Sequence, residues 1–152
     1  MDLQTILDNA VAAERAESMK TSPQLTLGEL ILKLEATATD QWPVIFDVAP
    51  WFPTHAGSWR GSYRELALDW TDKGKPMSLS SFLSMLRDCI GAVMTGYKGG
   101  DYLMGKTTPV WVANYGDSEG FGAEEEIGVI DVRLDASHVV LVTAPCELWR
   151  GA

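Results

Sequence analysis

The chain has 152 residues, of which 46% are hydrophobic and 22% charged, and this composition fits an ordinary soluble domain with a substantial core. No apolar run approaches the roughly 20 residues of a membrane-spanning helix, and the amino terminus lacks the basic start and apolar centre of a signal peptide, so we expect a cytoplasmic protein. The net charge of −9, without any cluster of Lys and Arg, excludes a general nucleic-acid binder, because phosphate backbones are bound through such clusters.

The first predicted element is a helix over residues 3–19 with a narrow apolar stripe. The stripe consists of Leu3, Ile6, Leu7, Ala10 and Val11. We interpret residues 1–22 as a helical extension and residues 23–152 as one domain. The stripe fits either docking on that domain or the seam of a homo-oligomer.

The second predicted helix, over residues 27–36, has the clearest local signals in the chain. Thr26 is a good N-cap, Glu29 completes a capping box, and Leu25 with Leu30 forms a hydrophobic staple. The apolar residues of this helix face one way, and Leu32 lies off that stripe.

A short β-rich run over residues 44–48, bounded by two prolines, predicts the first strand. Residues 50–61, PWFPTHAGSWRG, are predicted to be a loop because two prolines and two glycines interrupt them. Aromatics beside an arginine are typical of partner-binding or base-stacking sites, and equally of a lid over the core. The candidate residues of this aromatic loop are Trp51, Phe52, Trp59 and Arg60.

Residues 62–70 alternate in polarity and predict a strand, with a helix as the rival interpretation. Ser78 then fits the N-cap of a long helix that the apolar spacing continues to Met94, and this helix is expected to lie at the centre of the core. Gly91 inside that pattern indicates a close contact with a helix or sheet.

Residues 96–116, GYKGGDYLMGKTTPVWVANYG, combine glycines, aromatics and a strand-like run. They predict a loop or short hairpin over residues 97–106 and a buried strand over 110–113. Lys98 lies among glycines, as in an anion cradle, and with Tyr97 and Asn114 it forms a candidate ligand site. The alternative is that the glycines only shape turns. A P-loop is excluded, since it requires a preceding strand and a following helix.

Acidic residues gather between positions 117 and 131, where no basic residue occurs. They are Asp117, Glu119, Glu124, Glu125, Glu126 and Asp131. Such a segment fits a negative face for a basic partner surface, a cation-binding segment, or a solvated loop that aids solubility. Two strands over residues 127–134 and 138–143 follow, joined by a predicted hairpin turn.

No catalytic or metal-binding pattern is present. Cys89 and Cys146 are predicted to be reduced and mostly buried, and the two histidines lack the spacing of metal ligands. Candidate acids and bases have no partner at a spacing that chemistry demands; they are Asp47, His55, Asp69, Asp101 and Asp117. We therefore expect no enzymatic activity, no metal and no cofactor.

Together these elements predict an α+β domain, in which a largely antiparallel sheet of about five strands is covered on one face by two to three helices.

Three segments of the chain resemble a family of small proteins encoded by tailed bacteriophages and prophages. The segments are 26–31 (TLGELI), 58–68 (SWRGSYRELAL) and 96–116, and the resemblance covers about residues 25–143. The family has no assigned activity, so the resemblance carries over no catalytic residue. It implies an accessory protein that binds and inhibits, or redirects, a host protein in the cytoplasm of the infected bacterium.

Two functional hypotheses follow. In the first, the acidic segment imitates DNA phosphates toward a basic DNA-handling enzyme of the host. In the second, the glycine-rich turn around Lys98 binds a nucleotide or another small molecule, with an aromatic side chain stacked on it.

Overall fold

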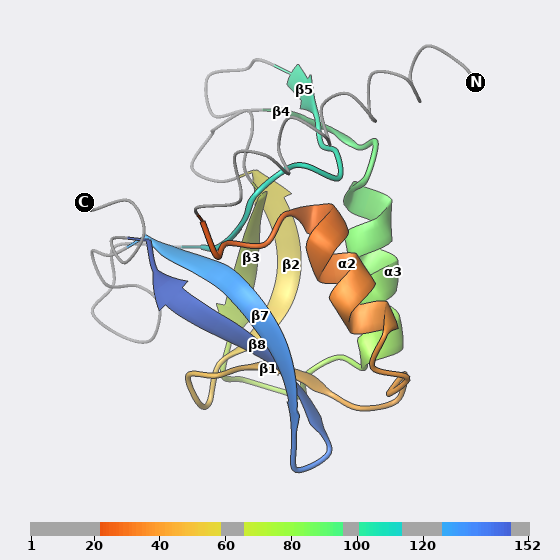
Figure 1. Cartoon of the computed structure of the whole chain (residues 1–152), viewed down its shortest axis with the longest axis vertical. Coiled ribbons are helices and arrows are strands. Elements are labelled where there is room, and N and C mark those ends of the chain that lie inside the picture. The colour runs from red at the N-terminus through yellow and green to blue at the C-terminus, as the bar shows by residue number, and fades with distance from the viewer. Residues whose placement is uncertain (1–21, 59–65, 96–100, 114–125, 147–152) are drawn as a thin grey trace.

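Two helices and eight strands make up the described part of the chain, which in this computed structural model comprises residues 22–58, 66–95, 101–113 and 126–146 (Figure 1). In chain order the elements are α2 (Leu27–Glu35), β1 (Val44–Phe46), β2 (Phe52–Ser58), β3 (Leu66–Thr71), α3 (Leu79–Cys89), β4 (Val93–Thr95), β5 (Asp101–Leu103), β6 (Val110–Val112), β7 (Ile127–Asp135) and β8 (His138–Pro145). The helix predicted over residues 3–19 lies outside the described residues.

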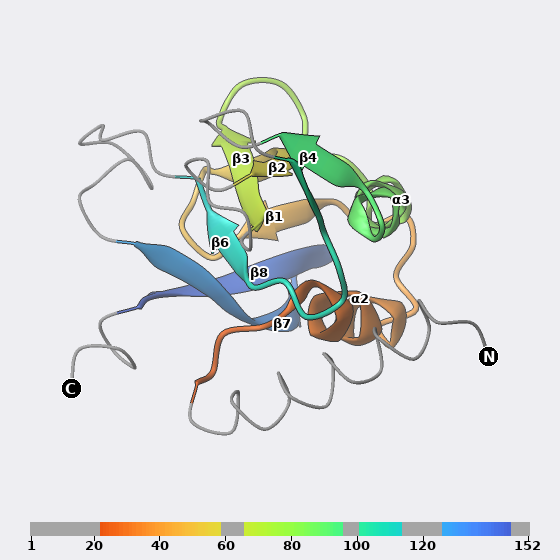
Figure 2. The same ribbon diagram turned by 90° about the horizontal axis from the view of Figure 1, so that it is seen from above.

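Six strands form one sheet in the order β1-β8-β7-β6-β3-β2, while β4 and β5 pair separately as an antiparallel hairpin. The two end strands of the sheet come together, because the N–H of Phe46 in β1 donates to the carbonyl of Trp51 beside β2 at 3.1 Å. The sheet is therefore a nearly closed barrel. Figure 2 shows α2 and α3 along one side of it, and Arg87 of α3 pairs with Glu35 of α2 at 3.3 Å.

The α+β class is confirmed, but the prediction of a largely antiparallel sheet of about five strands is wrong in strand direction, because the sheet is mixed. The sheet has six strands, and both β1–β8 and β3–β6 are parallel. Each parallel pair joins strands that are distant in sequence, and α3 provides the long crossover that a parallel β3–β6 pair requires. Local periodicity carries no information on such pairings.

The capping box of α2 is confirmed. Thr26 Oγ1 accepts the N–H of Glu29, and Glu29 Oε1 accepts the N–H of Thr26 at 2.9 Å. Leu27, Leu30, Ile31 and Leu34 are buried, and Leu32 is exposed, as the stripe predicts.

The long helix ends earlier than predicted. Ser78 is its N-cap, but α3 stops at Cys89, and Val93 begins a strand. Gly91 adopts φ +79°, and a Cβ added there would meet nothing within 4 Å. The glycine therefore permits a left-handed turn, and the expectation that it marks a close contact is wrong.

The loop predicted over residues 50–61 is also wrong, because β2 occupies Phe52–Ser58. Its register shifts between Pro53 and His55 as in a β-bulge, and β2 is an end strand of the sheet. Proline is tolerated in this position because an end strand has a side on which no N–H is needed.

The remaining strands agree more closely with expectation. The structure confirms the β7–β8 hairpin, and Ala136 and Ser137 in its turn have φ of 49° and 65°, the left-handed values of a type I′ turn. Leu66, Ala67 and Leu68 of β3 are all buried, so the predicted alternation does not continue through that strand. Neither described helix is long and apolar enough to cross a membrane.

Candidate functional site

Residues 113–126 connect β6 to β7 and contain every residue of the predicted acidic segment except Asp131, which lies in β7; we call them the acidic connection. The structure describes both points at which this connection joins the barrel. At the first, the N–H of Ala113 donates to the carbonyl of Leu68 at 2.9 Å. The carbonyl of Ala113 accepts the indole N–H of Trp70 at 2.8 Å. Ala113 is therefore fixed to β3 through both of its backbone polar groups.

Glu126, at the other end of the connection, is fixed to the residue that follows β8. Its carbonyl accepts the N–H of Cys146 at 2.8 Å, and the thiol of Cys146 donates to Glu126 Oε2 at 3.7 Å. Since Val112 pairs with Ile127, Ala113 and Glu126 lie opposite each other at the end of the β6–β7 ladder. The connection leaves and re-enters the barrel at one place.

The outer face beneath these ends carries a row of small residues around one tryptophan. Gly57, Ala67, Trp111, Gly128 and Ala144 stand side by side in register across five neighbouring strands. Trp111 is fully buried and clusters with Ala67 and Ala113, apart from the main core inside the barrel. Residues in register share a face of the sheet, so this second cluster lies on the outer face.

Two residues along each strand, the same face carries ionisable groups. His55 of β2 stands opposite Asp69 of β3, and the register continues through Ala113 and Glu126 to Cys146. Burial raises the pKa of Asp69 above its ordinary value of 3.8, and the neighbouring His55 opposes that shift. The two ends of the acidic connection, Ala113 and Glu126, therefore join a row that already contains a carboxyl group and an imidazole.

Of the candidate acids and bases, only His55 and Asp69 are brought together among the described residues. The pair faces across the β2–β3 ladder, with His55 opposite Asp69. Asp47 has a structural role, because its carboxylate accepts two hydrogen bonds from Thr143. The backbone N–H of Thr143 donates at 3.1 Å and the hydroxyl of Thr143 donates at 2.6 Å, and together they connect the end of β1 to β8.

The described residues of the aromatic segment cover the core. Phe52 is only 6% exposed. The ring of Trp51 packs edge-on against Trp70, with centroids 4.6 Å apart and an interplanar angle of 72°. For these two residues the structure favours the interpretation as a lid over the core. Trp59 and Arg60 lie outside the described residues.

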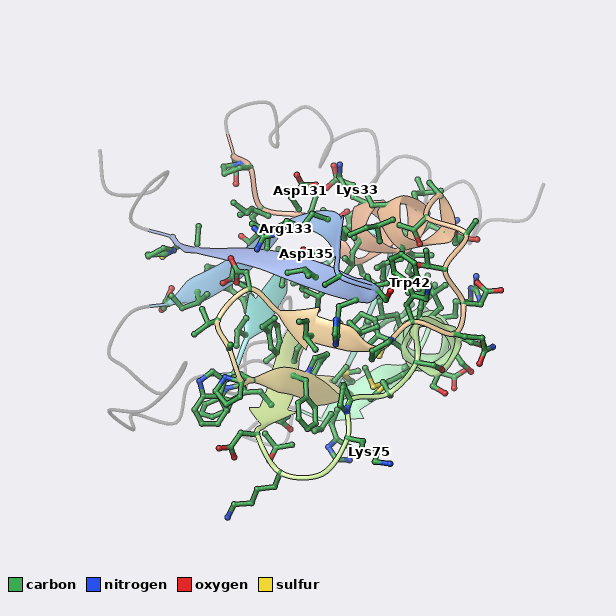
Figure 3. All side chains as sticks on the ribbon, turned by 90° about the horizontal axis from the view of Figure 1, so that it is seen from below. Lys33, Trp42, Lys75, Asp131, Arg133 and Asp135 are labelled. Atoms are coloured by element: carbon green, nitrogen blue, oxygen red, sulfur yellow. The ribbon has the colours of Figure 1, made fainter. Side chains whose placement is uncertain are left out.

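Of the predicted acidic face, only Glu126 and Asp131 are described. Asp131 forms an ion pair with Lys33 of α2 at 3.3 Å, and its carboxylate also accepts the N–H of Val132 at 2.8 Å (Figure 3). The charge of Asp131 is thus locally balanced. Asp117, Glu119, Glu124 and Glu125 lie outside the described residues.

The predicted ligand residues Tyr97, Lys98 and Asn114 also lie outside the described part. Residues 96–100, which include Lys98, connect the antiparallel strands β4 and β5, and this context differs from the strand and helix that flank a P-loop.

Helix N-termini, which often bind phosphate, are already occupied here. In α2 the N–H groups of Leu27 and Gly28 donate to the carbonyls of Thr108 and Lys106. In α3 the N–H groups of Leu79 and Ser80 donate to the carbonyls of Trp42 and Asp40. Neither described helix presents a free N-terminus to an anion.

The two cysteines are not joined by a disulfide; Cys89 is buried and Cys146 is half-buried. Within the described ranges, no group of three or more His, Cys, Asp or Glu residues is placed to hold a metal ion.

Sequence reasoning did not find the row around Trp111 or the anchoring of Ala113 and Glu126. The four small residues of the row are scattered between positions 57 and 144, and they become neighbours only through strand pairing. The one sequence signal was the length of the β6–β7 connection.

Comparison of the chain with protein-family models, with curated proteins and with solved structures finds no match. The described parts of residues 26–31, 58–68 and 96–116 meet in space. β3 pairs with β6 from Leu66 to Leu68, and Thr26, the N-cap of α2, bridges to Pro109 directly before β6. These described parts of the segments build the centre of the fold.

Proposed function

We propose that this protein is a bacteriophage accessory protein that binds a host protein through the acidic connection between β6 and β7. The observation that carries this proposal is that the connection is long and that hydrogen bonds fix both of its ends to the barrel. Antiparallel neighbours usually need about two to five connecting residues, whereas here β6 ends at Val112 and β7 begins at Ile127. Connections of this length are uncommon within a small domain, and those that occur are usually functional loops or linkers.

These fixed ends support a binding role for the connection. Hydrogen bonds from Trp70 and to Leu68 hold Ala113, and the N–H and thiol of Cys146 hold Glu126. Fixed ends reduce the conformational entropy that a binding loop loses on association.

The negative charge of the connection indicates the kind of surface that the partner presents. Between these anchors the sequence contains Asp117, Glu119, Glu124 and Glu125 and no Lys or Arg. We infer that the partner is a host protein with a positively charged surface, of the kind that DNA-handling enzymes use for phosphate. Long-range attraction then accelerates association and weakens as salt is added.

The test compares two variants with the same change of net charge. One neutralises the connection with Asp117→Asn, Glu124→Gln and Glu125→Gln. The control neutralises three exposed acids elsewhere, with Asp40→Asn, Asp72→Asn and Asp88→Asn. Tagged full-length proteins are used to capture partners from bacterial lysate at low and high salt, and captured proteins are identified by mass spectrometry.

The proposal expects a basic protein that is captured by the wild type and by the control, and that is lost with the connection variant and at high salt. Equal loss with both triple variants would show that only net charge matters. Capture that is unaffected by the connection variant would rule out this segment as the binding site.

A further inference from the structure

The far half of β7 has an open edge. On one side β7 pairs with β8 from Ile127 to Asp135. On the other side its first half is covered: β6 pairs with Ile127 and Gly128, the N–H of Leu25 donates to the carbonyl of Val129, and Lys33 pairs with Asp131. From Val132 to Asp135 no strand of the described chain pairs with this side, and Figure 1 shows the hairpin extending past both helices.

The turn geometry determines which backbone groups face the open side. In a two-residue type I′ hairpin the flanking residues, here Asp135 and His138, exchange hydrogen bonds. Alternate residues then face outward, so the N–H and C=O groups of Val132 and Leu134 point away from β8. The N–H of Val132 already donates to the carboxylate of Asp131. Leu134 therefore offers an open donor and acceptor, and its side chain is 45% exposed.

Charges alternate along the outer face of the same strand. Asp131, Arg133 and Asp135 are exposed and follow one another at every second position (Figure 3). Asp131 is paired with Lys33, whereas Arg133 and Asp135 form no ion pair with any described residue.

We propose that this edge binds the same edge of a second copy of the chain, antiparallel and about a two-fold axis at Leu134. Leu134 then lies opposite the partner's Leu134 and exchanges two backbone hydrogen bonds with it. Arg133 lies opposite the partner's Asp135, and Asp135 opposite the partner's Arg133. The contact is self-complementary, as a two-fold interface requires.

The charges also select this register. Centring the pair on Arg133 would place arginine against arginine and Asp131 against the partner's Asp135, and like charges directly opposite are destabilising. Centring it on Val132 would require an N–H and a carboxylate that are already engaged with each other. Only the register centred on Leu134 matches opposite charges and uses the open backbone groups.

The contact is short, so the association is weak and depends on concentration and salt. It pairs residues 133–135 of one copy with the same residues of the other, and so short a contact buries much less than the roughly 1,000 Å² of surface that marks a stable interface. It is independent of the acidic connection and of any host partner.

The experiment uses two charge variants of the full-length chain, Arg133→Glu and Asp135→Arg. In either variant, self-pairing would place like charges opposite each other twice. In a mixture, each chain would instead place opposite charges against the other at both positions. Both residues are exposed, so folding is preserved, and circular dichroism checks this. Sedimentation equilibrium at about 50 mM and about 500 mM salt measures association, since screening lengths differ several-fold between these conditions.

The expected result is a wild-type dimer that is weakened at high salt, two monomeric variants, and association restored when the variants are mixed. A wild type that stays monomeric up to millimolar concentration at low salt would overturn the proposal. So would dimers of either variant as strong as those of the wild type, or a mixture that does not associate. A third variant, Leu7→Glu, tests the amino-terminal stripe as the alternative interface. If Leu7→Glu abolishes the dimer and Arg133→Glu does not, the interface lies at that stripe and the proposal is wrong.

Discussion

Gly28, in the first turn of α2, donates its N–H to the carbonyl of Lys106 at 2.8 Å, and a Cβ built on it would lie 3.0 Å from that oxygen and 3.0 Å from Lys106 Cβ. Glycine is a poor helix former, yet here it allows the start of a helix to rest directly on the backbone that leads into β6. This contact joins α2 to the segment that leads into β6.

Gly28→Ala is expected to lower the free energy of unfolding by up to about 2 kcal/mol. The gain in helix propensity of about 1 kcal/mol is outweighed by displacement of the Lys106 backbone, because overpacking typically costs about 1–3 kcal/mol. Chemical denaturation measures the change. Gly105→Ala is the control, since a Cβ there meets nothing within 4 Å; equal effects of the two variants would contradict the prediction.

Trp70→Phe should loosen the first anchor of the acidic connection. The substitution keeps an aromatic ring beside Trp51 but leaves the carbonyl of Ala113 without its indole donor, and an unsatisfied buried group costs about 1–3 kcal/mol. We expect a lower free energy of unfolding and weaker capture of a host partner. Trp42→Phe is the matched control, because the indole N–H of Trp42 makes no hydrogen bond within the described residues.

The Asp69→Asn variant should become more stable relative to the wild type as pH rises. Burial raises the pKa of Asp69 in the folded protein above its ordinary value of 3.8, so the folded state holds this proton more tightly than the unfolded chain does. Its favourable contribution is complete below pH 3.8 and is lost as pH rises through the folded pKa. Denaturation midpoints of both proteins between about pH 3 and pH 7 test this linkage.

His55 supplies the internal check on that experiment. Its charge opposes the shift at Asp69, so His55→Gln in a wild-type background should steepen the loss of stability with pH. A stability difference between Asp69→Asn and the wild type that does not change with pH would contradict the assignment.

Cys89 should resist alkylation in the native protein while Cys146 reacts. Cys89 is 6% exposed, and burial, reinforced by Asp88, raises the pKa of its thiol, so little reactive thiolate is present. Cys146 is half-buried near the surface. Iodoacetamide labelling followed by peptide mass spectrometry should find Cys89 modified only after unfolding. Equal labelling of the two cysteines in the native state would show that α3 opens readily.

Features that depend on neighbouring residues could be predicted from the sequence. The capping box at Thr26, the N-cap at Ser78, the buried strand at Val110 and the turn after Asp135 each rest on a few adjacent side chains, and all are present. They are the parts of the fold in which local preference and tertiary packing agree.

The failures occur where tertiary context overrides local preference. Pro53 and Gly57 led to the prediction of a loop, because proline and glycine disfavour central strands. They are tolerated in β2 because this strand lies at the end of the sheet. Val93 continues a helical spacing, and only the left-handed turn at Gly91 shows why the helix stops before it. The row around Trp111 depends on strand order, which no local pattern encodes.

The pairing of β1 with β8 also determines when the barrel can form during synthesis of the chain. β1 lies near the start of the described chain, and its partner is the last described strand. While a ribosome synthesises the chain, Val44 and Phe46 emerge long before Val139 and Leu141, which they later join in the core. The barrel can close only after β8 has been synthesised, and until then these apolar residues are available to chaperones or to neighbouring nascent chains.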